Sequence, residues 1–197
     1  MTAATVPKHV ALFGGSFNPI HCGHVQLARQ AVRLGSADEV WLMVSPQNPL
    51  KPQSALLDEQ ARLRLARLAV DGQEGVRVSD FEFHLPRPSY TWDTLQALRA
   101  AYPAISFSLL IGADNWALFH KWAHHDELLR DYSFIVYPRE GYPVDADTLP
   151  SNVSLLQAEL FPWSSTLIRE RIQRGEDCSD IVPRAAYDEI IRCGYYK

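Results

Sequence analysis

Short apolar stretches alternate along this chain with longer segments of helical periodicity, and this alternation limits the possible folds more than any other feature. The apolar stretches predict strands at residues 9–13, 39–44, 76–83, 105–111, 132–137 and 153–156. The segments between them predict helices at residues 23–34, 58–69, 91–102 and 165–174. Strands separated by helices pair in parallel through right-handed crossovers. The sequence therefore predicts an α/β fold, a doubly wound parallel sheet in three layers.

The predicted helix after residue 58 has the pattern of an amphipathic surface helix. Asp58 is suited to cap its first turn. Its apolar side chains recur at helical spacing, at Ala61, Leu65, Leu68 and Ala69. The arginines of this helix are expected mostly on its outer side, at Arg62, Arg64 and Arg67. The proline-rich loop before it, at residues 46–52, is long enough to take part in function.

Length, charge and apolar content exclude several classes of protein. The 197 residues are expected to form a single domain. Nineteen basic and twenty-three acidic residues leave a net charge of −4, so no nucleic acid partner is expected. No apolar run reaches the roughly 18 residues of a membrane span and no secretory signal is evident, so we expect a cytoplasmic protein without a membrane partner. The cysteines lack a CxxC pair and are expected as free thiols, at Cys22, Cys178 and Cys193.

The segment GGSFNPIHCGH, at residues 14–24, joins the first predicted strand to the first predicted helix. Its glycines let the backbone approach a phosphate, whose charge is attracted by the free N–H groups and the dipole at the helix start. His21 and His24 are three residues apart and can point at one ligand. The GxxxxGK(S/T) loop of P-loop NTPases and the GxGxxG turn of dinucleotide-binding proteins are both absent. A phosphate-binding turn of another kind is predicted.

His21-Cys22-Gly23-His24 matches the (H/T)xGH motif of a nucleotidyltransferase superfamily, and GGSFNPIH resembles the GG(T/S)FDPIHxGH of the nicotinate-mononucleotide adenylyltransferase family. The resemblance implies a Rossmann-like nucleotidyltransferase fold and an enzyme that makes deamido-NAD and pyrophosphate from ATP and nicotinate mononucleotide. It also implies ATP contacts from the turn, at Gly14, Gly15, Ser16 and Phe17. Asn18 stands where most members have Asp, which keeps the shape and loses a charge.

A second stretch, WSSTLIR at residues 163–169, resembles the ISSTxIR element of the same family. Its hydroxyl residues are typical of a helix start whose N–H groups can receive an anion. Arg169 lies about one turn further on, where a cation is unfavourable unless an anion is bound. A catalytic role is expected for Arg169, and ATP contacts are expected from Ser164, Ser165 and Thr166. A plain helix cap with a solvated arginine is the alternative.

A third stretch, PSYTWDTL at residues 88–95, resembles the family's PSYTxDTL. In the family this segment and a downstream tryptophan hold the pyridine ring and its carboxylate, which implies substrate contacts from Tyr90, Thr91 and Trp122. N–H donors at a helix start favour a carboxylate over a neutral amide, so nicotinate is expected rather than nicotinamide. Core packing is the alternative for these aromatic residues, and it weighs more for Trp116 than for Trp122.

Single polar residues after other predicted strands complete the set that the resemblance implies. Gly112 and Asp114 match the family's GxD element, and Arg139 follows the next strand; all three are expected to contact the nucleotide. Lys51 matches a lysine that closes the family's PPHK-like segment and is expected to reach the triphosphate. The wording of its loop, PQNPLK, departs from the commoner one.

His120, His124 and His125 raise a metal site as an alternative, through the spacing of four between His120 and His124. HExxH is absent and no clear carboxylate ligand is near, so these residues are expected as surface histidines and no protein-held metal is expected. The only expected cofactor is Mg²⁺, held mainly by the phosphates of ATP.

The expected chemistry needs no general base, because the 5′-phosphate of the mononucleotide is already ionised at neutral pH. Catalysis is expected from alignment and charge neutralisation by His21, His24, Lys51 and Arg169. In this arrangement a core at about residues 8–140 is completed by a C-terminal strand and helices at about 150–197. The segments near residues 20 and 166 must then meet at one edge of the sheet.

Two alternatives stay open. One is another transferase of the superfamily, such as pantetheine-phosphate adenylyltransferase or a cytidylyltransferase, which lacks the combination of PSYTxDTL with a downstream tryptophan. The other is a nucleotide-sensing module that has kept the pocket and lost turnover. The oligomeric state is also open, and a homo-oligomer is compatible with the sequence.

Overall fold

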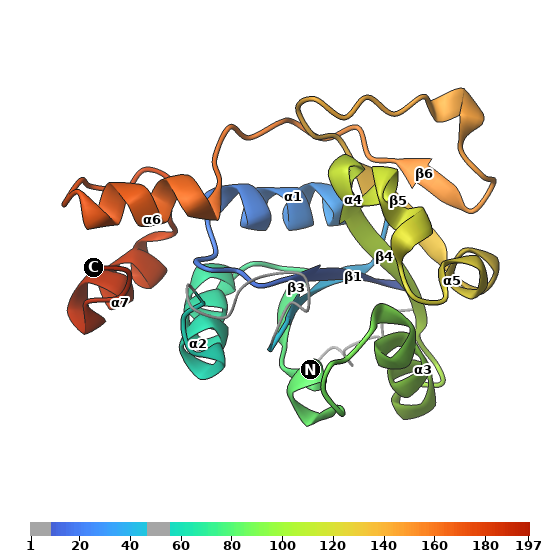
Figure 1. The fold of residues 1–197 in the computed structure, drawn as a ribbon, viewed down its shortest axis with the longest axis horizontal. Coiled ribbons are helices and arrows are strands. Elements are labelled where there is room, and N and C mark those ends of the chain that lie inside the picture. The colour runs from blue at the N-terminus through green and yellow to red at the C-terminus, as the bar shows by residue number, and fades with distance from the viewer. Residues whose placement is uncertain (1–8, 47–55) are drawn as a thin grey trace, which may run out of the picture.

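The structure, a computed structural model, describes residues 9–46 and 56–197. A six-stranded sheet forms its centre, in the order β3-β2-β1-β4-β5-β6, with neighbouring strands parallel (Figure 1). The strands are β1 (His9–Gly15), β2 (Glu39–Val44), β3 (Val76–Ser79), β4 (Ser106–Gly112), β5 (Ser133–Tyr137) and β6 (Val153–Leu155). The chain runs outward from β1 to β3 and then returns to β4 on the other side of β1. Ligands of open α/β sheets bind at such a switch point, beyond the carboxyl ends of the strands.

Helices and short 3₁₀ turns connect the strands. The helices are α1 (Cys22–Arg33), α2 (Glu59–Val70), α3 (Thr91–Ala101), α4 (Ala113–Ala117), α5 (His125–Asp131), α6 (Ser165–Gln173) and α7 (Arg184–Cys193). The 3₁₀ turns include η2 (Phe81–His84), η3 (Phe119–Lys121) and η4 (Ala146–Thr148). The predicted cap of α2 is confirmed, because Asp58 Oδ1 accepts the backbone N–H groups of Gln60 and Ala61 at 2.9 and 3.2 Å.

Alternating residues of the sheet separate two hydrophobic cores. In β1, Ala11 and Phe13 belong to one core, whereas Val10 and Leu12 belong to the other. Side chains from α1, α2, α6 and α7 complete the first core, and side chains from α3, α4 and α5 complete the second. Figure 1 shows α1 and α3 on opposite sides of β1. This arrangement confirms the predicted three-layer, doubly wound α/β fold.

One predicted strand is wrong at its far end. The strand expected at residues 76–83 stops at Ser79, whose Oγ accepts the backbone N–H of Phe81 at 3.2 Å, and the chain turns into η2. A side-chain bond of this kind gives the backbone an alternative to the strand ladder. The turn points Glu82 toward the carboxyl end of β2, where its side chain bonds Ser45.

Two expectations from composition can be compared with the structure. The three cysteines are free, as predicted. Across the described ranges, none of the helices combines the length and apolar content that crossing a bilayer requires.

Candidate active site

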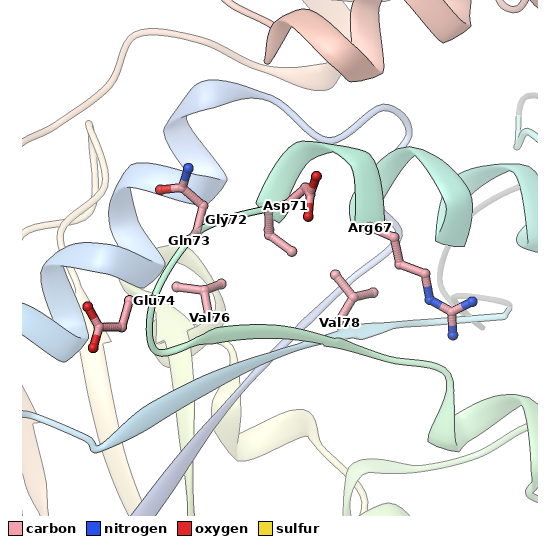
Figure 2. Close-up of a pocket in the computed structure, with 8 residues that line it drawn as sticks. Arg67, Asp71, Gly72, Gln73, Glu74, Val76 and Val78 are labelled. Carbon is pink, nitrogen blue, oxygen red and sulfur yellow. The ribbon is translucent and has the colours of Figure 1, made fainter. Parts of the chain in front are cut away.

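A cavity of about 310 Å³ opens at the carboxyl ends of β1 and β4. Its walls come from the turn after β1, the ends of β2 and β4, the start of α3 and the segment after η3. The predicted site residues that line it are Gly14, Gly15, Ser16, Tyr90, Thr91, Gly112 and Trp122. A second hollow of about 470 Å³, between the end of α2 and β3, contains none of the predicted site residues (Figure 2). The cavity at the switch point is therefore the candidate site.

The turn after β1 is folded closely over Phe17. A Cβ on Gly15 would lie 2.9 Å from Cζ of the Phe17 ring, so this position requires glycine. Phe17 has a φ of 44°, which is unfavourable for a residue with a Cβ. Strained backbone of this kind is concentrated at functional sites. Its ring is buried and packs edge-on against Phe13, with 5.8 Å between ring centroids. The side chain of Phe17 therefore belongs to the core, and an ATP contact from this residue would come from its backbone.

His21 and His24 face each other at the start of α1. Their ring centroids are 3.7 Å apart, and His24 Nδ1 accepts the backbone N–H of His21 at 3.2 Å. This bond places the proton of a neutral His24 ring on Nε2, from which it can be donated to a phosphate oxygen. A Cβ on Gly23 would lie 3.1 Å from the His21 ring, so the glycine between the histidines makes their pairing possible.

The His21 ring is buried and uncharged at neutral pH. Burial, together with the positive charge of Arg139, lowers the pKa of His21 to about 4. Its Nδ1 is buried and has no hydrogen-bond partner among the described residues. Buried polar atoms usually have a partner, so the unpaired nitrogen is a departure from the rule at the centre of the predicted site. The histidine pair is therefore equipped to donate N–H groups rather than to supply positive charge.

The start of α6 contacts the histidine turn, as the sequence analysis required. Ser165 Oγ donates to the Pro19 carbonyl at 2.9 Å, and Arg169 Nη1 donates to the Asn18 carbonyl at 2.8 Å. Ser164 Oγ caps the helix by accepting the backbone N–H of Leu167 at 3.2 Å. The hydroxyls of both serines are thus used within the protein. A phosphate at this helix start would be bound by its backbone N–H groups.

Arg62 corrects an expectation. It was expected on the outer side of α2, yet its side chain is fully buried. Its guanidinium donates to the carbonyls of Ser16 and Ser45 at 2.7 Å each, and to those of Pro46 and Leu57 at 3.0 and 2.8 Å. Four carbonyl oxygens satisfy the donors of this buried cation. The sequence contained a signal for this, because Arg62 shares the helical spacing of the buried residues that follow it, at Leu65, Ala66 and Ala69.

The contact between Arg62 and Ser16 also orients the glycine-rich turn. In a trans peptide unit the C=O and N–H groups point in opposite directions. Because the Ser16 carbonyl points at Arg62, the N–H of Phe17 points away from it. Arg62 thereby holds one donor of the turn facing away from α2.

The ends of β4 and β5 bring together the residues of the GxD element and Arg139. Asp114 Oδ1 lies 3.6 Å from Arg139 Nε, and a Cβ on Gly112 would lie 2.2 Å from the same carboxylate oxygen. Cζ of Arg139 lies 5.4 Å from the centre of the Tyr137 ring, within range of a cation–π contact. Gly112 is therefore needed for the close approach of Asp114, and the three predicted nucleotide contacts form one group.

The aromatic residues divide between the cavity and the core. Trp122 lines the cavity, and its ring centroid lies 5.6 Å from that of Phe119. Trp116 stacks on Phe119 at 5.2 Å and packs against Phe134, which confirms the core alternative for this residue. Tyr90 is exposed at the N-cap position of α3, and Thr91 is the first residue of that helix.

Two further positions from the sequence remain, Lys51 and His124. Lys51 lies outside the described residues. The ring of exposed His124 stacks on Trp92 at 5.6 Å, and its Nδ1 lies 3.6 Å from Glu127 Oε1. Within residues 9–46 and 56–197, no three His, Cys, Asp or Glu side chains converge in a way that could hold a metal ion.

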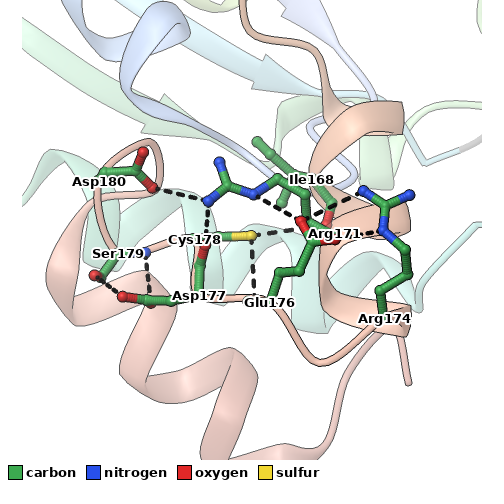
Figure 3. A network of polar contacts seen from close by, with 8 residues as sticks. All are labelled: Ile168, Arg171, Arg174, Glu176, Asp177, Cys178, Ser179 and Asp180. Atoms are coloured by element: carbon green, nitrogen blue, oxygen red, sulfur yellow. Dashed lines mark hydrogen bonds and ion pairs between the residues drawn. The ribbon is translucent and has the colours of Figure 1, made fainter.

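The segment after α6 supports the histidine turn from behind. Arg171 donates to the Asp177 carbonyl and lies 3.6 Å from Asp180 Oδ1, which fixes the bend of the chain between α6 and α7 (Figure 3). The same bend places the Ile181 carbonyl where it accepts the backbone N–H of Cys22 at 2.8 Å. This N–H belongs to the first turn of α1 and has no partner inside the helix. The C-terminal segment therefore satisfies a backbone group between the two histidines.

Comparisons with known proteins agree with the geometry. The family model described as cytidylyltransferase-like matches residues 12–171. A protein of Bacteroides fragilis named "Probable nicotinate-nucleotide adenylyltransferase" is 46% identical over 181 residues, which cover 92% of this chain and 90% of the relative. A protein of Flavobacterium johnsoniae with the same name is 37% identical and covers 95% of this chain and 98% of the relative.

A solved structure has the same fold. The nicotinic acid mononucleotide adenylyltransferase of Plasmodium falciparum, complexed with NaAD, superposes with a TM-score of 0.82 over 96% of this chain and 97% of that one. Its sequence is 20% identical, so this likeness concerns the fold. From the family model and the relatives together, the chain belongs to the nicotinate-nucleotide adenylyltransferase family of nucleotidyltransferase enzymes.

Proposed function

We propose that this chain transfers AMP from ATP to nicotinate mononucleotide and releases pyrophosphate, with deamido-NAD as the product. The observation that carries the proposal is the contact between the histidine turn and the start of α6. It brings the two histidines, Arg169 and the start of α6 next to the turn that lines the cavity. Groups of these kinds bind the oxygens of a polyphosphate.

The reaction forms a bond between a 5′-phosphate oxygen of the mononucleotide and the α-phosphorus of ATP, and it breaks the bond from that phosphorus to the bridging oxygen. The attacking oxygen is already ionised, so no residue has to remove a proton. His21 and His24 donate N–H groups to phosphate oxygens, and Arg169 neutralises charge that moves onto the pyrophosphate. Lys51, outside the described residues, is proposed for the same task.

Mg²⁺ is proposed as the cofactor, held mainly by ATP phosphate oxygens, where it supplies further charge neutralisation. The proposed phosphate-binding residues are compatible with this, because a cation that is coordinated by the triphosphate does not need a set of protein ligands. Gly112, Asp114 and Arg139, which lie together at the ends of β4 and β5, are proposed to contact the nucleotide.

The start of α3 supports a preference for nicotinate over nicotinamide. Tyr90 and Thr91, at the first turn of this helix, line the cavity together with Trp122. Unpaired N–H groups and the helix dipole stabilise a carboxylate more than a neutral amide. We expect a higher kcat/KM for nicotinate mononucleotide than for nicotinamide mononucleotide, and equal values would contradict this placement.

One assay separates the proposal from its rivals. The protein is incubated with Mg²⁺ and ATP or CTP, and with nicotinate mononucleotide, nicotinamide mononucleotide or phosphopantetheine, while pyrophosphate is measured. Release that requires ATP and nicotinate mononucleotide supports the proposal. Release with phosphopantetheine or CTP indicates another transferase of the superfamily, and binding without release indicates a nucleotide-sensing module.

A further inference from the structure

Glu82 is a residue of the cavity that the reaction above does not use. It is the only carboxylate among the cavity-lining residues that the structure describes. Glu82 was not among the predicted site residues, because it lies in a segment that was expected to continue a strand and that forms η2 instead. Glu82 lies only eight residues before Tyr90, so its closeness in sequence to the predicted substrate segment was a signal for it. The turn into η2 then brings both residues to one cavity.

The carboxylate of Glu82 lies within a hydrogen-bonded path that crosses the cavity wall. Ser45 Oγ donates to its Oε2, and Thr94 Oγ1 donates to its Oε1, both at 3.0 Å. The backbone N–H of Ser45 donates to the Gly15 carbonyl at 2.9 Å, and that of Thr94 to the Tyr90 carbonyl at 3.0 Å. Glu82 therefore lies between the glycine-rich turn and the start of α3.

Neither partner of this carboxylate is charged. A charge withdrawn from water without an opposite charge is unfavourable, and burial raises the pKa of Glu82 accordingly. Each carboxylate oxygen has accepted one hydrogen bond from the protein and can accept another. A ligand with hydroxyl groups would supply the missing donors without bringing a charge of its own.

We propose that Glu82 accepts hydrogen bonds from the ribose hydroxyls of the mononucleotide substrate. The inference rests on the proposed function, in which the pyridine ring lies against Tyr90, Thr91 and Trp122 and the phosphate lies at the glycine-rich turn. The ribose joins these two groups, so it has to lie between the two ends of the cavity, where Glu82 is held. Carboxylates are well suited to accept hydrogen bonds from a ribose diol.

The test measures kcat/KM for nicotinate mononucleotide and for its 2′-deoxy and 3′-deoxy analogues, at saturating ATP, in the wild type and in Glu82→Gln. In the wild type we expect at least one deoxy analogue to lose about 10- to 100-fold, the usual effect of a lost hydrogen bond to a charged group. In Glu82→Gln we expect that ratio to fall toward 1. The KM for ATP should stay within about 2-fold, since a lost ribose contact does not touch the triphosphate.

Glu74→Gln serves as the matched control, because Glu74 is exposed and lies at the hollow between α2 and β3 (Figure 2). A purely structural role for Glu82 predicts that Glu82→Gln slows all three substrates equally and leaves the ratio unchanged, which would overturn the inference. Equal kcat/KM values of the wild type for the three substrates would overturn it too, even if the variant does not fold. No pyrophosphate from the wild type with nicotinate mononucleotide would instead overturn the proposed function on which the inference rests.

Discussion

At the scale of the residue, the protonation state of His21 is set by what surrounds it. An ordinary histidine titrates near 6.5, whereas burial and Arg139 lower the pKa of His21 to about 4. The motif predicts which residue occupies the turn, but neither the burial of its ring nor the approach of Arg139 is visible in the sequence. A histidine that stays neutral serves as a hydrogen-bond donor across the physiological pH range.

The lowered pKa predicts a loss of stability in mild acid. The unfolded chain takes up a proton at His21 below about pH 6.5, while the folded protein resists it until about pH 4, so the stabilisation is complete above the first value and lost by the second. Between pH 7 and pH 5, the free energy of unfolding of the ligand-free wild type should fall by about 2 kcal/mol more than that of His21→Gln. Urea titrations of both proteins measure this, and identical slopes with pH would show that His21 is not held neutral.

His24→Ala should lower turnover and leave the fold intact. His24 is partly exposed, and its Nε2 is the donor that we place on a phosphate oxygen, so its loss should reduce kcat by about 10²- to 10³-fold. Pyrophosphate release gives kcat, and thermal unfolding followed by circular dichroism reports on the fold. His120→Ala, an exposed histidine outside the cavity lining, is the control. Unchanged turnover in His24→Ala would remove this residue from the mechanism.

At the scale of the element, the apolar strands and the longer helices were predictable because each has a period of its own. Helices α4 and α5 are five and seven residues long, too short for a helical period to stand out. Helix α7 was covered only by the general expectation of C-terminal helices at about residues 150–197 and was given no bounds, although its amphipathic sequence runs for ten residues. The predicted end of β3 was wrong because the Ser79 side chain accepts the backbone N–H of Phe81 and the chain turns there.

Helix α2 is joined to two loops of the site through Arg62, and this predicts a strong effect of a conservative substitution. Lysine offers a compact charge instead of a planar fork, so Arg62→Lys cannot serve all four carbonyls. We expect the free energy of unfolding to fall by about 3 kcal/mol. Arg67→Lys, on the exposed side of the same helix, should change it by less than about 0.5 kcal/mol. Chemical denaturation measures both, and similar small losses would show that Arg62 does not brace these loops.

At the scale of the whole molecule, the two distant segments near residues 20 and 166 meet, as predicted. The parallel pairing of the strands could be predicted from the alternation of strands and helices, and the contact between α6 and the turn before α1 followed from the two motifs. Two arginines that hold the surrounding loops were not predictable, because Arg62 and Arg171 both donate to backbone carbonyls of loops that are distant in sequence or irregular.

That all 197 residues form one domain stays a prediction, and it has a thermodynamic test. Side chains of α6 and α7 share a core with those of α1 and α2, so the C-terminal helices should not unfold separately. Scanning calorimetry should show one transition whose calorimetric and van't Hoff enthalpies agree. Two resolved transitions would indicate a C-terminal unit with its own stability.

The hydrogen bonds from α6 to the histidine turn span 146 and 151 positions along the chain. During synthesis on the ribosome, Pro19 and Asn18 emerge many seconds before Ser165 and Arg169 exist, at the usual rate of about 5–20 residues per second. A nascent polypeptide can therefore form most of its sheet while one side of the nucleotide site is still missing. The chain therefore becomes able to catalyse the reaction only when α6 has been made. A chain that is terminated before α6 would consume no ATP.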